Sequence, residues 1–339
     1  MILHAALLPV FYSRAAEFSC VAIIGQKYSP SDSQRLDWVR IDAYGTVSLI
    51  RKIEVPANSS ADLSPDGSMV LTSSGSDGLA RLLLHGPSGR PASATLGRIT
   101  GETLHTEFSQ NSRFILASLA LSTDKRAFHV YSRSLKPLGK AVASAGSRHS
   151  WTRDGRLALS GEVFKTEGTG FAQAPSSSIS SEHKPGIYPN QDGSITYSAT
   201  ENLFWTRSGK QIQFRPYSGV SHLLWADKNR FVFSGSDYRG LLKPRHYSVL
   251  QQIRWNPESE SFGPAEVLYR GGSGFPEGDP SLTFPSTPIG VLDDGVVVVD
   301  TRQDGDKIVW LKDRLPYTLC QLPAGDRGFR AVQLIGPKK

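Results

Sequence analysis

Three histidines stand at similar places in the sequence. His105, His149 and His222 each lie two or three residues before an aromatic side chain. Histidine titrates near neutral pH and is a common metal ligand, so histidines that a fold brings together can bind a metal ion or transfer protons. The alternative is that they hydrogen-bond to water or backbone, and the choice depends on the strands that carry them.

Motifs of the common enzyme classes are not found. A serine hydrolase of the α/β class needs Gly-x-Ser-x-Gly on a strand–turn–helix unit, and the sequences around Ser76 and Ser273 are too short for it. Neither a Walker sequence nor a glycine-rich turn that opens a helix is present to hold a phosphate. We therefore assign no catalytic residue, no cofactor and no metal ion from the sequence.

A cluster of aspartates near the C-terminus resembles a calcium loop only in composition. Asp300, Asp304 and Asp306 lack the alternating oxygen ligands and the distal glutamate of an EF-hand. A polar hairpin turn is the interpretation that we adopt for this segment.

The composition favours a turn-rich β protein. The 339 residues include 32 Gly, 21 Pro, 15 Phe, 11 Tyr and 6 Trp, a mixture typical of turns and aromatic strands. Cys20 and Cys320 exclude a disulfide-dense scaffold. We expect two buried free thiols, with a bridge in an oxidising compartment as the alternative.

Membrane and export signals are weak. No window approaches the ~20 apolar residues of a membrane helix. The apolar stretch Ala5–Phe11 is interrupted by Pro9 and lacks the basic residues of a signal peptide. We expect a cytoplasmic protein with no membrane partner, and we leave a periplasmic or secreted location open.

A short turn that recurs along the chain is the strongest signal. An apolar or aromatic residue is followed by two variable residues, usually by Asp or Asn, and then by a small turn residue and an apolar strand. Asp-Gly and Asn-Ser adopt positive φ at low steric cost, so each copy predicts a hairpin. The six copies are Leu63–Gly67, Phe108–Ser112, Trp151–Gly155, Tyr188–Gly193, Trp225–Asn229 and Val291–Gly295.

The spacing of the copies matches one blade of a β-propeller. Consecutive copies lie 36 to 45 residues apart, apart from a last gap of 66 residues. A four-stranded blade takes ~40–45 residues. We interpret the last gap as one blade with insertions at Asp237–Arg245 and Gly271–Ser286. Because a single blade cannot bury both of its faces, the blades must stack into a closed ring.

We therefore predict an all-β fold, with one β-propeller domain over residues 1–339. Its first blade combines residues from about 1–57 with 328–336, so that the C-terminal strand closes the ring. Later blades begin near residues 60, 105, 148, 186, 221 and 287. Seven four-stranded blades are preferred, and six or eight are the alternatives. In another arrangement Leu7–Tyr12 supplies the first strand of the composite blade.

The copy Ser64-Pro65-Asp66-Gly67 resembles the Ser-Pro-Asp-Gly turn of WD40-like propellers of the TolB type. In that family the turn is structural, so the resemblance implies a role in the fold, and not in function, for the matching residues. These are Asp66, Asn111, Asp154, Asp192 and Asp294. No blade ends in the Trp-Asp of the true WD40 repeat, and we see no secretory signal or extra N-terminal domain of the kind that TolB-like proteins carry.

A propeller would bring the candidate residues to two places. The innermost strands line a central channel, which makes His105, His149 and His222 candidate channel residues. Loops on a rigid frame bind partners, and Tyr and Arg are favoured anchors. The candidate partner contacts on the two insertions are Tyr238, Arg239, Lys243, Arg245, Phe275 and Phe284.

Three functions are compatible with this sequence. The preferred hypothesis is a non-catalytic scaffold that binds protein partners as a subunit or adaptor of a larger complex. The first alternative is an enzyme or lectin that binds a sugar, lactone or peptide at the channel. The second is a nucleic-acid-associated subunit with a basic surface, because the net charge is +7. Without a dense run of Lys and Arg, this charge indicates solubility only.

Overall fold

The computed structural model of the protein consists of strands joined by turns and loops. Among the described residues no helix is long and apolar enough to cross a membrane. The residues that the structure describes are 18–27, 33–57, 59–75, 78–98, 104–109, 111–144, 149–151, 157–159, 162–167, 170–173, 187–190, 194–198, 203–206, 208–213, 220–239, 245–271, 287–300 and 305–336.

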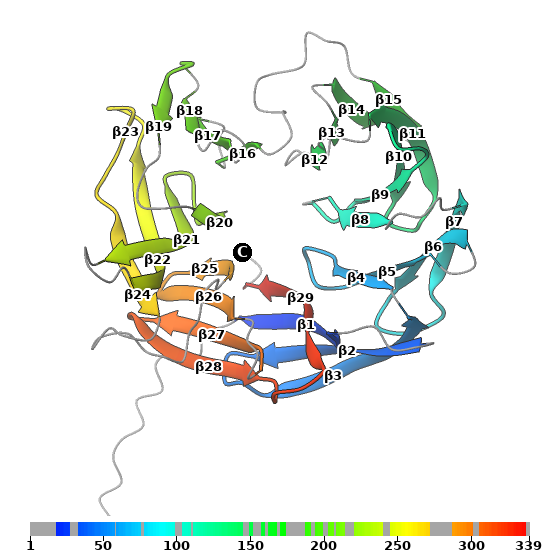
Figure 1. Cartoon of the computed structure of the whole chain (residues 1–339), viewed down its shortest axis with the longest axis horizontal. Helices are drawn as coiled ribbons and strands as arrows, with labels where there is room; N and C mark the ends of the chain where they lie inside the picture. Colours follow the sequence, from blue (N-terminus) through cyan, green and yellow to red (C-terminus); the bar gives the residue numbers. More distant parts are fainter. Residues whose placement is uncertain are drawn as a thin grey trace, which may run out of the picture.

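The described strands form seven antiparallel sheets around a central axis (Figure 1). From the innermost strand outward, sheet 1 consists of β29 (Arg327–Ile335), β1 (Ser19–Gln26), β2 (Ser33–Asp42) and β3 (Val47–Pro56). Sheet 2 consists of β4 (Ser60–Leu63), β5 (Val70–Ser74), β6 (Leu79–His85) and β7 (Ala92–Arg98). Sheet 3 consists of β8 (His105–Phe108), β9 (Phe114–Ala120), β10 (Lys125–Ser132) and β11 (Pro137–Ser144).

The other four sheets repeat this order. Sheet 4 consists of β12 (His149–Trp151), β13 (Leu157–Leu159), β14 (Glu162–Glu167) and β15 (Gly170–Gln173). Sheet 5 consists of β16 (Ile187–Pro189), β17 (Ile195–Ser198), β18 (Leu203–Thr206) and β19 (Gln211–Gln213). Sheet 6 consists of β20 (Val220–Trp225), β21 (Arg230–Arg239), β22 (Arg245–Asn256) and β23 (Ser261–Phe262), with β24 (Glu266–Gly271) also paired to β22. Sheet 7 consists of β25 (Thr287–Leu292), β26 (Gly295–Asp300), β27 (Lys307–Lys312) and β28 (Leu315–Gln321). The predicted all-β propeller fold is thus confirmed.

Sheet 1 contains both ends of the described chain. Strand β29 pairs antiparallel with β1, from Ser19 opposite Ile335 to Gln26 opposite Arg327. The last strand is therefore the innermost strand of a sheet whose other strands come from the N-terminal part of the chain. This pairing covers the inner edge of β1, which would otherwise offer unpaired backbone groups to another chain.

Apolar side chains fill the seams between neighbouring sheets. Central strands are buried on both faces and read as continuous apolar runs, of which Val296–Val299 is the clearest. Aromatic residues that precede the turns pack in these seams: Phe108 lies in the cluster of sheets 2 and 3, Trp151 in that of sheets 3 and 4, and Trp225 against that of sheets 5 and 6.

The two cysteines are free and buried, which confirms the sequence expectation. Cys20 of β1 and Cys320 of β28 lie in one apolar cluster between sheets 1 and 7. Burial raises the pKa of Cys20 to about 12, and the neighbouring Cys320 adds to this shift. Both groups are therefore protonated thiols at neutral pH, which makes them poor nucleophiles.

The recurring turn in sheet 2 is held by its first serine. Ser64 Oγ donates a hydrogen bond to Asp66 Oδ1 (2.6 Å) and accepts one from Met69 N (3.0 Å). Gly67 has a φ of +65°, and a β-carbon there would lie 2.8 Å from Ile335 Cδ1. Glycine is therefore needed at this position both for its left-handed backbone and for the close approach of sheet 1.

Sheet 3 repeats this turn with other residues. Ser109 Oγ donates to Asn111 Oδ1 (2.8 Å) and accepts from Phe114 N (2.9 Å). Ser112 takes the left-handed position, with a φ of +57°. Asp66 and Asn111 thus have the structural role that the resemblance implies. Asp154 and Asp192 lie outside the described residues.

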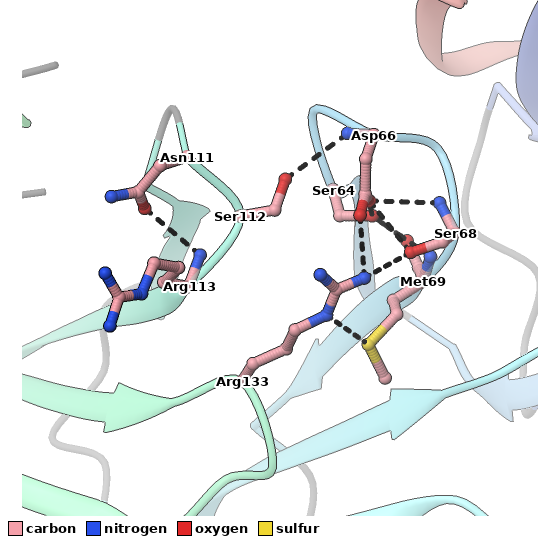
Figure 2. Close-up of polar contacts among 8 residues, drawn as sticks. All are labelled: Ser64, Asp66, Ser68, Met69, Asn111, Ser112, Arg113 and Arg133. Atoms are coloured by element: carbon pink, nitrogen blue, oxygen red, sulfur yellow. Dashed lines mark hydrogen bonds and ion pairs between the residues drawn. The ribbon is translucent and has the colours of Figure 1, made fainter. Parts of the chain in front are cut away.

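An arginine of sheet 3 fastens the turn of sheet 2 (Figure 2). Arg133 Nη2 donates to Asp66 Oδ2 (2.7 Å) and to Ser68 Oγ, and its Nε lies 3.3 Å from Met69 Sδ. Burial raises the pKa of Asp66, but hydrogen bonds from Ser64, Ser68 and Arg133 outweigh it and hold this pKa at about 2. We call this ionised contact between neighbouring sheets the 2–3 latch.

A second carboxylate fastens the two ends of the described chain to sheet 7. Asp306, 2% exposed, accepts hydrogen bonds from Lys27 Nζ (2.8 Å) and from Phe329 N (2.8 Å). A β-carbon at Gly328 would lie 2.5 Å from Asp306 Oδ2, so the backbone of β29 is in close contact with this carboxylate. From the sequence we expect only a polar turn here, whereas the structure gives Asp306 a buried structural role.

Replacing this carboxylate should loosen the junction of sheets 1 and 7. We expect Asp306→Ala to lower the free energy of unfolding by about 3 kcal/mol, because Lys27 and the Phe329 amide lose their partner in a buried site. Urea unfolding followed by tryptophan fluorescence measures this. Asp326→Ala, which removes an exposed carboxylate from the loop before β29, is the control and should change stability by less than about 0.5 kcal/mol. Equal stability of the two variants would contradict the role of Asp306.

Candidate functional site

The predicted partner contacts on the first insertion lie partly in regular strands. Tyr238 and Arg239 belong to β21 and Arg245 to β22, with Arg239 paired to Arg245. The insertion expected as a loop at residues 237–245 is therefore strand at both of its ends. Strand pairing overrides the local preference of Gly and Ser for loops, because each strand supplies the hydrogen bonds that the other needs.

Little can be said of the side chains that we expected to bind partners. Only the backbone is described at Tyr238, Arg239 and Arg245. Lys243, Phe275 and Phe284 lie outside the described residues.

The three candidate histidines lie in innermost strands. His105 is in β8, His149 in β12 and His222 in β20, which are the strands nearest the axis in sheets 3, 4 and 6 (Figure 1). The side chain of His105 is described and is 53% exposed. For the other two, the structure gives the backbone position only.

His105 faces an acidic neighbour on its own strand. Side chains two residues apart on a strand point to the same face, which brings His105 and Glu107 together. His105 Nε2 lies 3.8 Å from Glu107 Oε2. Glu107 raises the pKa of His105, although burial and the nearby Arg126 guanidinium oppose the shift. This face of β8 thus carries an acid–base pair close to the axis.

Asp62 completes a polar cluster from the neighbouring sheet. It lies in β4, half-buried, and accepts a hydrogen bond from Leu63 N (2.8 Å). Burial raises the pKa of Asp62 to about 6, and the Glu107 charge adds to the shift although backbone hydrogen bonds oppose it. We call Asp62, His105, Glu107 and Arg126 the inner-strand cluster.

The inner-strand cluster can exchange protons near neutral pH. A carboxyl group with a pKa of about 6 beside a histidine–glutamate pair has the properties of a general acid or base. No group of three or more His, Cys, Asp or Glu among the described residues is arranged to hold a metal ion. Asp62 and Glu107 were not among the residues predicted from sequence, although each directly precedes the apolar residue of a turn copy.

A second feature lies at the outer perimeter, where sheets 1 and 7 meet. Seven large apolar side chains are exposed in the described residues, and five of them belong to this region. They expose between 48% and 71% of their surface. We call these five the rim patch: Tyr44, Val47, Leu49, Leu315 and Tyr317.

The strand register shows that the two halves of the rim patch face each other. Leu49 is opposite Val39, whose side chain packs in the apolar cluster between sheets 1 and 7. Tyr317 is opposite Trp310, which packs in the same cluster from the other side, with ring centroids 6.2 Å apart. Opposite residues share a face of the sheet. The rim patch is therefore the exposed outer end of the seam between sheets 7 and 1.

A glycine brings the two sheets into contact beside the rim patch. Gly45, in the turn before β3, has a φ of +85°, and a β-carbon there would lie 2.6 Å from Leu319 O of β28. The turn that carries Tyr44 is thus pressed against the backbone of sheet 7. This contact sets the position of Tyr44 at the edge of the seam.

The raised pKa of Asp62 predicts a pH-dependent cost in stability. The unfolded carboxyl titrates near pH 4. Since the folded group titrates near pH 6, the folded state binds the proton more tightly, and its stability falls as the pH rises through this window.

Asp62→Asn keeps the hydrogen-bond acceptor and removes the charge. We expect it to raise the free energy of unfolding by about 2 kcal/mol at pH 7 and to leave it nearly unchanged at pH 4. Denaturant unfolding at both pH values measures this, with Asp124→Asn, an exposed carboxylate of sheet 3, as the control. The same gain at both pH values would contradict the proposed environment of Asp62.

Comparison with known proteins finds relatives by structure only. No protein-family model matches the sequence, and no curated protein matches it either. A proposed 6-phosphogluconolactonase from Bacteroides fragilis superposes with a TM-score of 0.54 at 12% identity, covering 94% of this chain and 98% of that one.

Two further structures resemble the chain less closely. The β-propeller domain of the Trilobed protease from Pyrococcus furiosus gives a TM-score of 0.46 at 11% identity, over 87% of this chain and 98% of that one. TolB from Acinetobacter baumannii gives a TM-score of 0.41 at 10% identity, over 93% of this chain and 67% of that one. Identities this low establish a shared fold and no activity. The chain is therefore a β-propeller protein in its fold.

Proposed function

We propose that this protein is a protein-binding propeller that takes its partner at the rim patch. The observation that carries this proposal is the concentration of exposed apolar side chains at the outer end of one seam. Contiguous exposed apolar surface is unfavourable in water and is typical of interaction sites. Two of the five side chains are tyrosines, which are favoured anchors in interfaces.

The partner that fits this surface is an extended segment with apolar side chains. Strands β3 and β28 each pair on one side only within the described residues, so both offer free backbone groups beside the rim patch. An extended chain can pair with such an edge while its alternate side chains enter the apolar seam. A partner of this kind makes the propeller a scaffold or adaptor.

Charged substitutions in the rim patch test the proposal. A photo-crosslinking residue at position 317 should capture one protein, and Leu49→Asp or Leu315→Asp should weaken the binding of that purified protein at least tenfold, because an aspartate would be buried in an apolar interface. Calorimetry measures the affinity. Val142→Asp is the matched control, since Val142 and Leu49 are both 52% exposed on outermost strands.

Two results would contradict this proposal. One is equal affinity of the Leu49→Asp and Val142→Asp variants. The other is that the partner binds only after residues 2–16 are deleted, because the chain's own apolar stretch Ala5–Phe11 would then be the occupant of the seam.

A small-molecule function at the axis is the second candidate, and the inner-strand cluster favours it. Asp62 and the His105–Glu107 pair provide proton donors and acceptors near neutral pH. A sugar or lactone offers hydroxyl and carbonyl groups that such side chains recognise. On this hypothesis the rim patch and the inner-strand cluster serve different ligands.

Turnover of a lactone panel tests this second candidate. We expect hydrolysis by the unmodified protein to depend on a group with a pKa of about 6, and Asp62→Asn to remove at least 90% of the rate, because the amide cannot exchange the proton. A pH–rate profile measures this, with Asp124→Asn as the control. An absence of turnover in the unmodified protein would contradict a lactonase function and leave the protein-binding proposal intact.

A further inference from the structure

The seam between sheets 6 and 7 contains a pocket of about 240 Å³. Its apolar wall comes from both sheets, with Leu268 of β24 on one side and Val291, Val296 and Leu311 of sheet 7 on the other. Charged and amide side chains surround this wall: Arg230, Gln252, Glu266, Asp293, Asp294, Asp313 and Arg314. The pocket thus combines one apolar wall with a predominantly charged surround.

The cations at the pocket are already matched by carboxylates. Arg230 pairs with Asp227 (3.2 Å), and Lys312, beside the pocket, pairs with Asp294 (3.4 Å). Arg314 pairs with Glu266 (2.5 Å). Hydrogen bonds from Gln252 and Arg314 lower the pKa of Glu266, so this carboxylate is ionised and already engaged.

Two carboxylates of the pocket have no such match. Within the described residues, the side chains of Asp293 and Asp313 make no ion pair or hydrogen bond. After the three pairs are subtracted, the pocket keeps two negative charges beside an apolar wall. A cation would therefore be attracted to it.

The position of Asp313 in the seam between sheets 6 and 7 can be compared with its equivalent in the seam between sheets 2 and 3. Arg133 N donates to Arg113 O (2.9 Å) in the turn of its own sheet, and Asp313 N donates in the same way to Asp294 O (3.4 Å). Asp313 is thus the counterpart of Arg133. The 2–3 latch has an arginine at this position, and the 6–7 seam has an aspartate.

The acidic half of the latch is present in both seams. Asn229 N donates to Asp227 Oδ1 (2.8 Å), as Ser68 N donates to Asp66 Oδ1 (3.2 Å). Asp227 is therefore the counterpart of Asp66. In the 6–7 seam, however, Asp227 pairs with Arg230 of its own sheet, and Asp313 lines the pocket at the position that Arg133 has in the 2–3 seam.

We propose that the pocket between sheets 6 and 7 binds a guanidinium or primary ammonium group on an aliphatic stem. The cationic group would lie between Asp293 and Asp313, which both line the pocket. The aliphatic stem would pack along Leu268, Val291 and Leu311. A hydrated inorganic cation has no apolar part that could make this contact. This site is independent of the rim patch and of the inner-strand cluster.

Calorimetry with two matched compounds tests the proposal on the full chain. N-acetyl-L-arginine amide should bind, and its neutral isostere N-acetyl-L-citrulline amide should bind at least tenfold more weakly. Asp293→Asn and Asp313→Asn should each weaken binding of the arginine compound at least tenfold. Asp124→Asn, remote from the pocket on sheet 3, should leave the affinity unchanged.

Two further measurements identify the source of the cation and guard against misfolding. Tighter binding of an Ac-Gly-Arg-Gly amide peptide than of agmatine indicates a basic protein segment, and the reverse order indicates a free amine; either supports the site. Asp313→Arg restores the arginine of the latch, so it should raise the melting temperature and abolish binding. Equal binding of the arginine and citrulline compounds, or no binding of either at millimolar concentration, would overturn the proposal.

Discussion

Central strands of this protein are apolar on both faces wherever both faces are described, and this one constraint governs the rest of the structure. Runs such as Val296–Val299 are buried from two sides, so a sheet is stable only between two neighbours. The first and last sheets of a linear array would each expose one face. Strand β29 joins β1 on the inner side of sheet 1, and sheet 1 then buries one face against sheet 7 and the other against sheet 2.

Polar contacts hold neighbouring sheets and their turns in place. Asp306 is buried because it joins sheet 7 to the Lys27 ammonium and to the backbone of β29, so its desolvation is compensated by a charge and a hydrogen bond. Ser64 and Ser109 stabilise the turns that follow the innermost strands β4 and β8. Each satisfies the carboxylate or amide that orders the turn, and the turn then presents its neighbour with a fixed surface.

The sequence was sufficient for the fold because its signals are local. A turn needs a positive-φ residue at one position, and Gly67 and Ser112 provide it where the pattern predicts. The rim patch could not be predicted in this way. It depends on the register of β3 and β28, which are far apart in the chain, so that Leu49 and Tyr317 look like ordinary strand residues until the seam is formed.

The inner-strand cluster was partly accessible from sequence. His105 was a candidate from its place before Phe108, but the properties of Asp62 come from a neighbouring sheet and from burial. The expectation of an open loop around Tyr238 was wrong because a non-local strand pairing overrode a local signal. A local composition of Gly, Ser and Asp favours a loop, and a partner strand with matching hydrogen bonds overrides it.

The features that lack a structural explanation are the ones most informative about function. The carboxylates of Asp66 and Asp306 are satisfied by partners of the fold, and the folded state gains from them. Asp62 is different, because its raised pKa means that the folded state disfavours its charge. The rim patch is likewise unfavourable, since its apolar side chains remain largely in water. A feature that costs stability is explained by a ligand, and both features lie at the ends of seams, where the packed sheets hold side chains in place and still leave them accessible.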